Sequence, residues 1–128
     1  MRRAFALITG SLLFLCVVKS QAEEDQAYKQ LMKDVGATFG SLGKDIQAKK
    51  SDSAAEDAQK LAGLFKQVEA FWAKSKTEDA IAFAQAGEKA SSQAAESAKA
   101  NNLDQASAAV NDIGKTCKGC HGAYKPKK

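Results

Sequence analysis

The chain has 128 residues, which is room for a single domain, and it carries 19 basic and 15 acidic residues for a formal net charge of +4. Three of the basic residues lie in the first 19 positions, so the charge does not indicate a nucleic-acid-binding protein. Proline occurs once, at Pro126, and no run of residues alternates with period two. These features exclude a β-rich fold and predict an all-α protein.

The N-terminal segment is similar to a secretory signal peptide. Arg2 and Arg3 precede an apolar run over residues 4–18, and Ser20-Gln21-Ala22 supplies small residues where a signal peptidase reads. Cleavage after Ala22 would remove residues 1–22, with three basic residues and no acidic one, and leave 16 basic and 15 acidic residues in a domain over 23–128. A retained membrane anchor is the alternative, but the run is short and interrupted. We expect an exported, periplasmic protein without stable membrane insertion after cleavage.

Four amphipathic helices are predicted along the mature chain. Apolar residues recur at steps of three and four over about 25–48, 54–72, 78–100 and 103–124. The third of these helices is mostly alanine and serine in its second half, which predicts a thin helix that packs closely. Short connections between four helices of similar length predict an antiparallel up-down four-helix bundle.

The expected helix starts have side chains suited to capping. Ser53 and Glu56 stand at capping-box spacing near the start of the second helix. Thr77 precedes the third helix and Asn102 the fourth. We therefore expect side-chain caps at these three starts.

The fourth helix carries the most specific motif of the chain. Cys117-Lys118-Gly119-Cys120-His121 has the C-x-x-C-H arrangement that attaches a c-type haem, with two thiols spaced for the two vinyl groups of one porphyrin and an imidazole for the iron. A thiol-disulfide motif would be expected beside a βαβ pattern. A structural zinc site needs four ligands, and Cys117, Cys120 and the single histidine make three. The motif therefore predicts one covalent haem c, with His121 as an iron ligand.

Met32 is the candidate for a second iron ligand. It is the one thioether left after removal of Met1, and it lies on the apolar stripe of the first helix. On position and composition alone, a core methionine that fills a gap between helices is an equal alternative.

The order of these elements resembles the class II cytochromes c, the cytochrome c-prime family. The haem motif of that family reads C-x-x-C-H-x-x-[Tyr/Phe]-[Arg/Lys], and it is matched one by one by Cys117, Cys120, His121, Tyr124 and Lys125. In the first helix, alignment of Phe39-Gly40 with the Phe-Gly of the family places Met32 at the distal position. Low-spin members carry methionine there, whereas high-spin members carry leucine or another non-ligating residue. The resemblance thus implies six-coordinate, low-spin iron, with Tyr124 and Lys125 in the proximal surroundings of the haem.

These observations predict a soluble, exported monohaem electron carrier that cycles between Fe(III) and Fe(II). The alternative is a protein that binds NO or CO, with an open distal side or a dissociable Met32. We expect no enzymatic activity, because the acidic residues are scattered and the one histidine is taken by iron. Redox proteins with an acidic docking surface are the expected partners, because lysines cluster around the haem motif. Both a monomer and a homodimer remain open.

Overall fold

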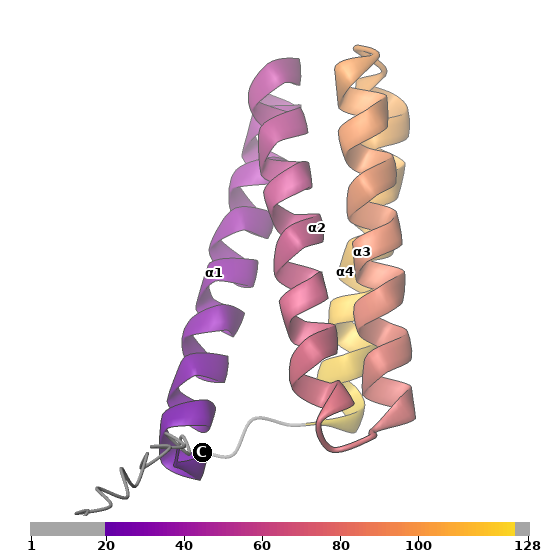
Figure 1. The fold of residues 1–128 in the computed structure, drawn as a ribbon. Helices are drawn as coiled ribbons and strands as arrows, with labels where there is room; N and C mark the ends of the chain where they lie inside the picture. Colours follow the sequence, from indigo (N-terminus) through magenta and orange to yellow (C-terminus); the bar gives the residue numbers. More distant parts are fainter. Residues whose placement is uncertain (1–19, 125–128) are drawn as a thin grey trace, which may run out of the picture.

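The computed structural model describes residues 20–124, which form four long helices that lie along a common axis (Figure 1). The helices are α1 (Gln21–Gln47), α2 (Ser51–Ala73), α3 (Glu78–Lys99) and α4 (Leu103–Ala123). Because each connection is only a few residues long, successive helices run in opposite directions. The prediction of an all-α, antiparallel four-helix bundle is confirmed, with each helix close to its expected bounds.

The first helix begins at a capping box that the sequence analysis did not identify. The Ser20 hydroxyl accepts a hydrogen bond from the backbone N–H of Glu23, and the Glu23 carboxylate accepts one from the backbone N–H of Ser20, both at 3.3 Å. The expected cleavage point after Ala22 therefore falls in the first turn of α1. Cleavage there would remove this cap. Residues 1–19 of the expected signal peptide lie outside the described residues.

The second helix starts earlier than its side chains suggested. Lys50 occupies the N-cap position without a side-chain hydrogen bond, and its carbonyl accepts from the N–H of Ala54 at 2.9 Å. Ser53 and Glu56 therefore lie inside α2, and the capping box expected from them is wrong. The tight turn that precedes the helix fixes its start. Thr77 is the N-cap residue of α3 but makes no side-chain cap.

The three connections share one backbone geometry. Lys49, Lys76 and Asn101 have φ angles of 57°, 53° and 56°, in the left-handed region. In each connection the next residue donates its N–H to the carbonyl five positions back, as Lys50 does to Asp45 at 2.8 Å. This is the Schellman arrangement, which satisfies carbonyls at the end of a helix. Asn102 then caps α4 as expected, by accepting from the N–H of Gln105 at 3.2 Å.

The core is packed most closely between α2 and α3, then between α3 and α4, whereas α1 packs on α2 and makes few contacts with α4. Every buried residue of α3 is alanine, glycine or serine, so the prediction of a thin, closely packed helix is confirmed. At its centre, the Phe65 ring of α2 lies against Gly87 of α3. A Cβ atom at position 87 would lie 2.5 Å from Phe65 Cε1, so only glycine permits this approach.

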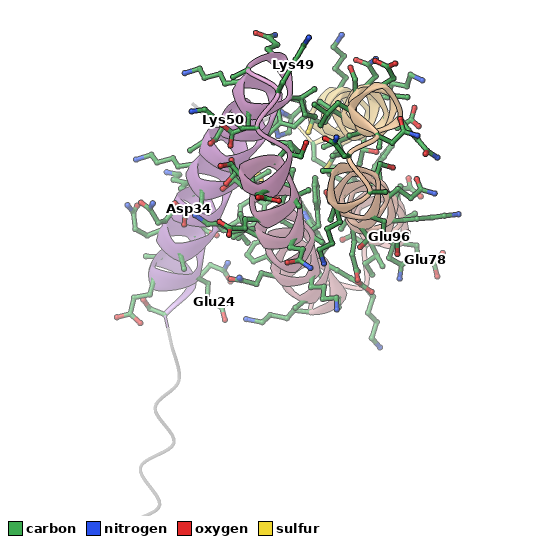
Figure 2. All side chains as sticks on the ribbon, turned by 90° about the horizontal axis from the view of Figure 1, so that it is seen from above. Glu24, Asp34, Lys49, Lys50, Glu78 and Glu96 are labelled. Atoms are coloured by element: carbon green, nitrogen blue, oxygen red, sulfur yellow. The ribbon has the colours of Figure 1, made fainter. Side chains whose placement is uncertain are left out.

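Charged side chains cover the outside of the bundle. Figure 2, a view along the bundle, shows labelled acidic and basic residues from α1, α2, α3 and the α1–α2 turn around its periphery. Among residues 20–124, none of the helices has the combination of length and apolar composition that crossing a membrane requires.

Candidate haem site

A cavity lies between the helices at the end of the bundle that carries the C-x-x-C-H motif. Its volume is about 210 Å³, or about 720 Å³ with the space that is open to solvent at its mouth. All four helices contribute to its walls. The lining residues are Tyr28, Met32, Val35, Gly36, Phe39, Phe65, Val68, Phe83, Ala84, Thr116, Cys117, Cys120 and His121.

The structure brings the four expected ligand and attachment residues to this one cavity. Cys117, Cys120 and His121 reach it from the last two turns of α4, and Met32 reaches it from α1. The helical period of α4 places Cys117 one turn before His121, so both line the cavity. The antiparallel arrangement places the first half of α1 beside the last half of α4. Residues that are 85 positions or more apart in sequence therefore share a site.

The two cysteines are half-buried free thiols. Burial raises the pKa of both the Cys117 and the Cys120 thiol. A catalytic C-x-x-C pair needs the opposite, a lowered thiol pKa that supplies thiolate near neutral pH. This environment does not favour thiol-disulfide chemistry, and it is compatible with thiols that are consumed by a covalent bond.

The remaining walls are mostly apolar and suit a porphyrin. Val35 and Phe39 of α1, Phe65 and Val68 of α2, and Phe83 of α3 present hydrocarbon to the cavity. With its open mouth, the cavity falls in the range of about 300–1,000 Å³ that is typical of ligand sites. The donor set is that of a c-type haem, with two thiols, an imidazole and a thioether. The residues present therefore fit the group that the motif predicts.

A glycine on α1 leaves space next to Met32. Gly36 lies one helical turn after Met32 and lines the cavity. A Cβ atom added there would meet no atom within 4 Å. The wall of the cavity is therefore open at this point, on the side of the expected distal ligand.

An aromatic cluster beside the cavity was missed by the sequence analysis. The Trp72 indole Nε1 donates a hydrogen bond to the Tyr28 hydroxyl at 3.1 Å. The Tyr28 ring stacks on Phe71 with centroids 4.0 Å apart, and Trp72 lies against Tyr124 with centroids 4.9 Å apart. Burial raises the pKa of Tyr28, and the hydrogen bond from Trp72 partly offsets this shift. The adjacent aromatic residues at the end of α2 were the available signal, but their partners come from other helices.

The two remaining family-motif residues stand differently. Tyr124 is the C-cap residue of α4, where it packs on Trp72 and does not line the cavity. Lys125 lies outside the described residues. The proximal roles of both stay predictions.

The basic surface expected around the motif is interrupted by acidic groups. Lys118 is exposed, but the Lys115 ammonium lies 2.9 Å from an Asp112 carboxylate oxygen. At the same end of the bundle, the first turn of α3 carries Glu78 and Asp79. This end therefore presents both signs of charge within the described residues.

Comparison with known proteins gives one match. Residues 24–125 match the family model described as Cytochrome C'. Proteins of this family bind one covalent haem c and are generally exported. Neither curated proteins nor solved structures gave a match. The matched segment spans most of the chain and contains every residue that was assigned to the haem.

Proposed function

This chain belongs to the cytochrome c-prime family, and we propose that it is an exported, periplasmic electron carrier. The family supplies the cofactor, one covalent haem c. When bound, that haem supplies one-electron exchange between Fe(III) and Fe(II). The observation that carries the proposal is the meeting of Met32 with the C-x-x-C-H motif in one largely apolar cavity.

Each residue has a distinct role in this proposal. Cys117 and Cys120 hold the haem through thioether bonds, which prevents its loss in an exported compartment. His121 is the proximal ligand, and Met32 is the distal ligand. A thioether ligand favours the ferrous state and raises the reduction potential. The apolar walls exclude water and limit solvent rearrangement when the charge on iron changes.

The alternative function, binding of NO or CO, has its own supporting observation. Gly36 leaves open space one turn from Met32, so a diatomic ligand could enter there without displacing a side chain. In that case Met32 dissociates from the iron or fills a gap in the core. The two functions therefore differ in the state of one side chain.

We propose no enzymatic role for this site. No carboxylate lines the cavity in the described part of the chain, and the groups that line it and can exchange protons are two thiols, a phenol and an imidazole. If the thiols and the imidazole are taken by the haem, only the Tyr28 hydroxyl remains. General acid–base catalysis usually requires a group with a pKa near neutrality, and burial moves that of Tyr28 further away.

The partner is proposed to be another redox protein that docks at the cavity end of the bundle. His121 is exposed at this end, beside the half-buried Trp72 and Tyr124. Because acidic and basic residues alternate around it, complementary charge of both signs would orient the partner.

Absorption and electron paramagnetic resonance spectra of the oxidised holoprotein test the proposal. With Met32 on the iron, the spectra are low-spin, with a weak far-red charge-transfer band. Met32→Leu then abolishes the band, gives high-spin iron, lowers the reduction potential and increases CO binding, while the haem stays attached. This substitution conserves volume and costs under about 1.5 kcal/mol, so lost ligation dominates over unfolding.

The reciprocal variant Leu31→Met is the matched control. Leu31 is the half-buried neighbour of Met32 on α1 and does not line the cavity, so its replacement should leave the spectra unchanged. A wild-type spectrum that is already high-spin at neutral pH would contradict the electron-carrier proposal and favour gas binding.

A further inference from the structure

The haem-binding turn of α4 is in contact with α3 through one aromatic ring. Phe83 of α3 lies against Gly119, the residue between the two motif cysteines. A Cβ atom at position 119 would lie 2.5 Å from Phe83 Cε1 and 3.1 Å from Cζ. Real Cβ atoms essentially never approach another heavy atom within 3.0 Å. The ring therefore occupies space that any side chain at position 119 would need.

The position of this ring is fixed by the helix that carries it. Ala80 and Ala84, which lie on either side of Phe83 along α3, are 0% and 2% exposed. Their burial holds the first half of α3 against the core. Phe83 itself is half-buried and lines the cavity together with Cys117 and Cys120. The ring can turn about its own bonds, but its backbone cannot withdraw from α4 without opening the core.

The other glycines of α4 lack such a contact. A Cβ atom at Gly122 would meet nothing within 4 Å, and one at Gly114 would lie at an ordinary 3.7 Å from Phe39 Cζ. The close approach is therefore specific to Gly119. It is also the glycine enclosed by the two haem-attachment cysteines, so its contact bears directly on where those thiols lie.

We propose that Phe83 is a positioning residue for the haem-binding turn. Its ring, seated on Gly119, sets how closely the segment from Cys117 to His121 approaches α3. Because His121 follows directly on this segment, the contact also sets the orientation of its imidazole. The inference rests on the proposed role of His121 as an iron ligand, and it is independent of whether Met32 binds the iron.

A double-mutant cycle on the holoprotein tests this role. The variants are Gly119→Ala, Phe83→Ala and the two combined, with Gly122→Ala as the matched control in the same turn. The readouts are the yield of covalent haem, the electron paramagnetic resonance spectrum of the ferric protein and the iron–histidine vibration of the ferrous protein. The last two report the geometry of the imidazole, which a contact that only stabilises the fold would not change.

The expected result is a defect that depends on Phe83. Gly119→Ala should lower the holoprotein yield at least twofold and shift both spectra, whereas Gly122→Ala should leave all readouts at wild-type values. Phe83→Ala should shift the spectra, and in that background the alanine at position 119 should add no further defect. If Gly119→Ala yields no holoprotein at all, recovery in the double variant supports the proposal.

Two results would overturn it. One is a Gly119→Ala variant that behaves like Gly122→Ala. The other is a defect of Gly119→Ala that is the same with and without Phe83. The failure of the assigned iron ligand looks different: a wild-type protein without an iron–histidine vibration would refute His121 ligation itself, before any variant is compared.

Discussion

The two ends of the bundle are packed in different ways. At one end, which we call the alanine end, the core residues are all 0% exposed and most of them are alanine: Leu42, Ala54, Ala58, Ala94, Ala98 and Ala106. At the other, the cavity end, large side chains line or flank the cavity and are only partly buried: Tyr28, Met32, Phe39, Trp72 and Cys117. Small residues let helices close on one another, whereas large ones hold them apart around a space. The chain completes its own core at the alanine end and leaves the cavity end to the haem.

Removal of the haem should therefore affect the two ends unequally, and this is the largest effect we expect. In Cys117→Ser/Cys120→Ser, even ~200 Å² of lost apolar contact corresponds to about 5 kcal/mol at ~25 cal/mol per Å². Backbone hydrogen exchange, compared with the holoprotein, should show lost protection in the first half of α1 and the last half of α4. The alanine end should keep most of its protection. Equal loss along all four helices would refute the division into two ends.

Between the two ends, the contact of Phe65 with Gly87 should be the most sensitive point of the protein core. Gly87→Ala places a Cβ atom 2.5 Å from a ring that is only 5% exposed, so the free energy of unfolding should fall by about 1–3 kcal/mol. Gly63→Ala on the exposed side of α2 meets nothing within 4 Å and should raise it by up to about 1 kcal/mol. Denaturant unfolding of both variants checks this pair. A Gly87→Ala protein as stable as Gly63→Ala would show that the ring moves freely.

At the cavity end, Tyr28→Phe should cost about 1 kcal/mol, because the Trp72 indole loses the hydroxyl that accepts its hydrogen bond. The variant should also change the pH dependence of stability. Burial raises the pKa of Tyr28 above its ordinary value of 10.0, so the folded state keeps a proton that the unfolded state releases. Stability from this group is present below pH 10 and is lost as the pH rises above it.

Thermal unfolding of wild type and Tyr28→Phe between pH 8 and 11 (values on the order of the ordinary tyrosine pKa) measures this dependence. The wild type should lose its advantage at the alkaline end of the series. Parallel curves for the two proteins would contradict a raised pKa at Tyr28.

The smallest effects are expected in the turns, one at each end of the bundle. Lys49 and Lys76 hold a left-handed conformation that costs a residue with a side chain about 1–2 kcal/mol, and glycine avoids that cost but orders a more flexible chain. Lys49→Gly and Lys76→Gly should each raise the free energy of unfolding by up to about 1 kcal/mol. Lys60→Gly, on an exposed position inside α2, is the control and should lower it by about 1 kcal/mol. Destabilisation by Lys49→Gly would contradict the strain argument.

The sequence by itself determined the helices and the chemistry of the α4 motif. Apolar residues at steps of three and four predicted each helix, because this period is a local property of the backbone. The C-x-x-C-H spacing predicted haem attachment, because the two thiols and the imidazole lie within five consecutive residues. The family match to residues 24–125 supports the cofactor prediction, and the roles of the individual residues stay predictions.

Only the tertiary structure decided which helices meet at which residues. The period of α1 places Met32 on an apolar stripe, but the relative rotation and spacing of the helices bring it to the cavity with Cys117. The start of α2 was predicted wrongly, because a turn set by Lys49 overrides the capping preference of Ser53. The contact between Phe83 and Gly119 has no signal in either helix alone. It depends on a distance between two helix axes, and that distance is the outcome of all the small side chains packed between them.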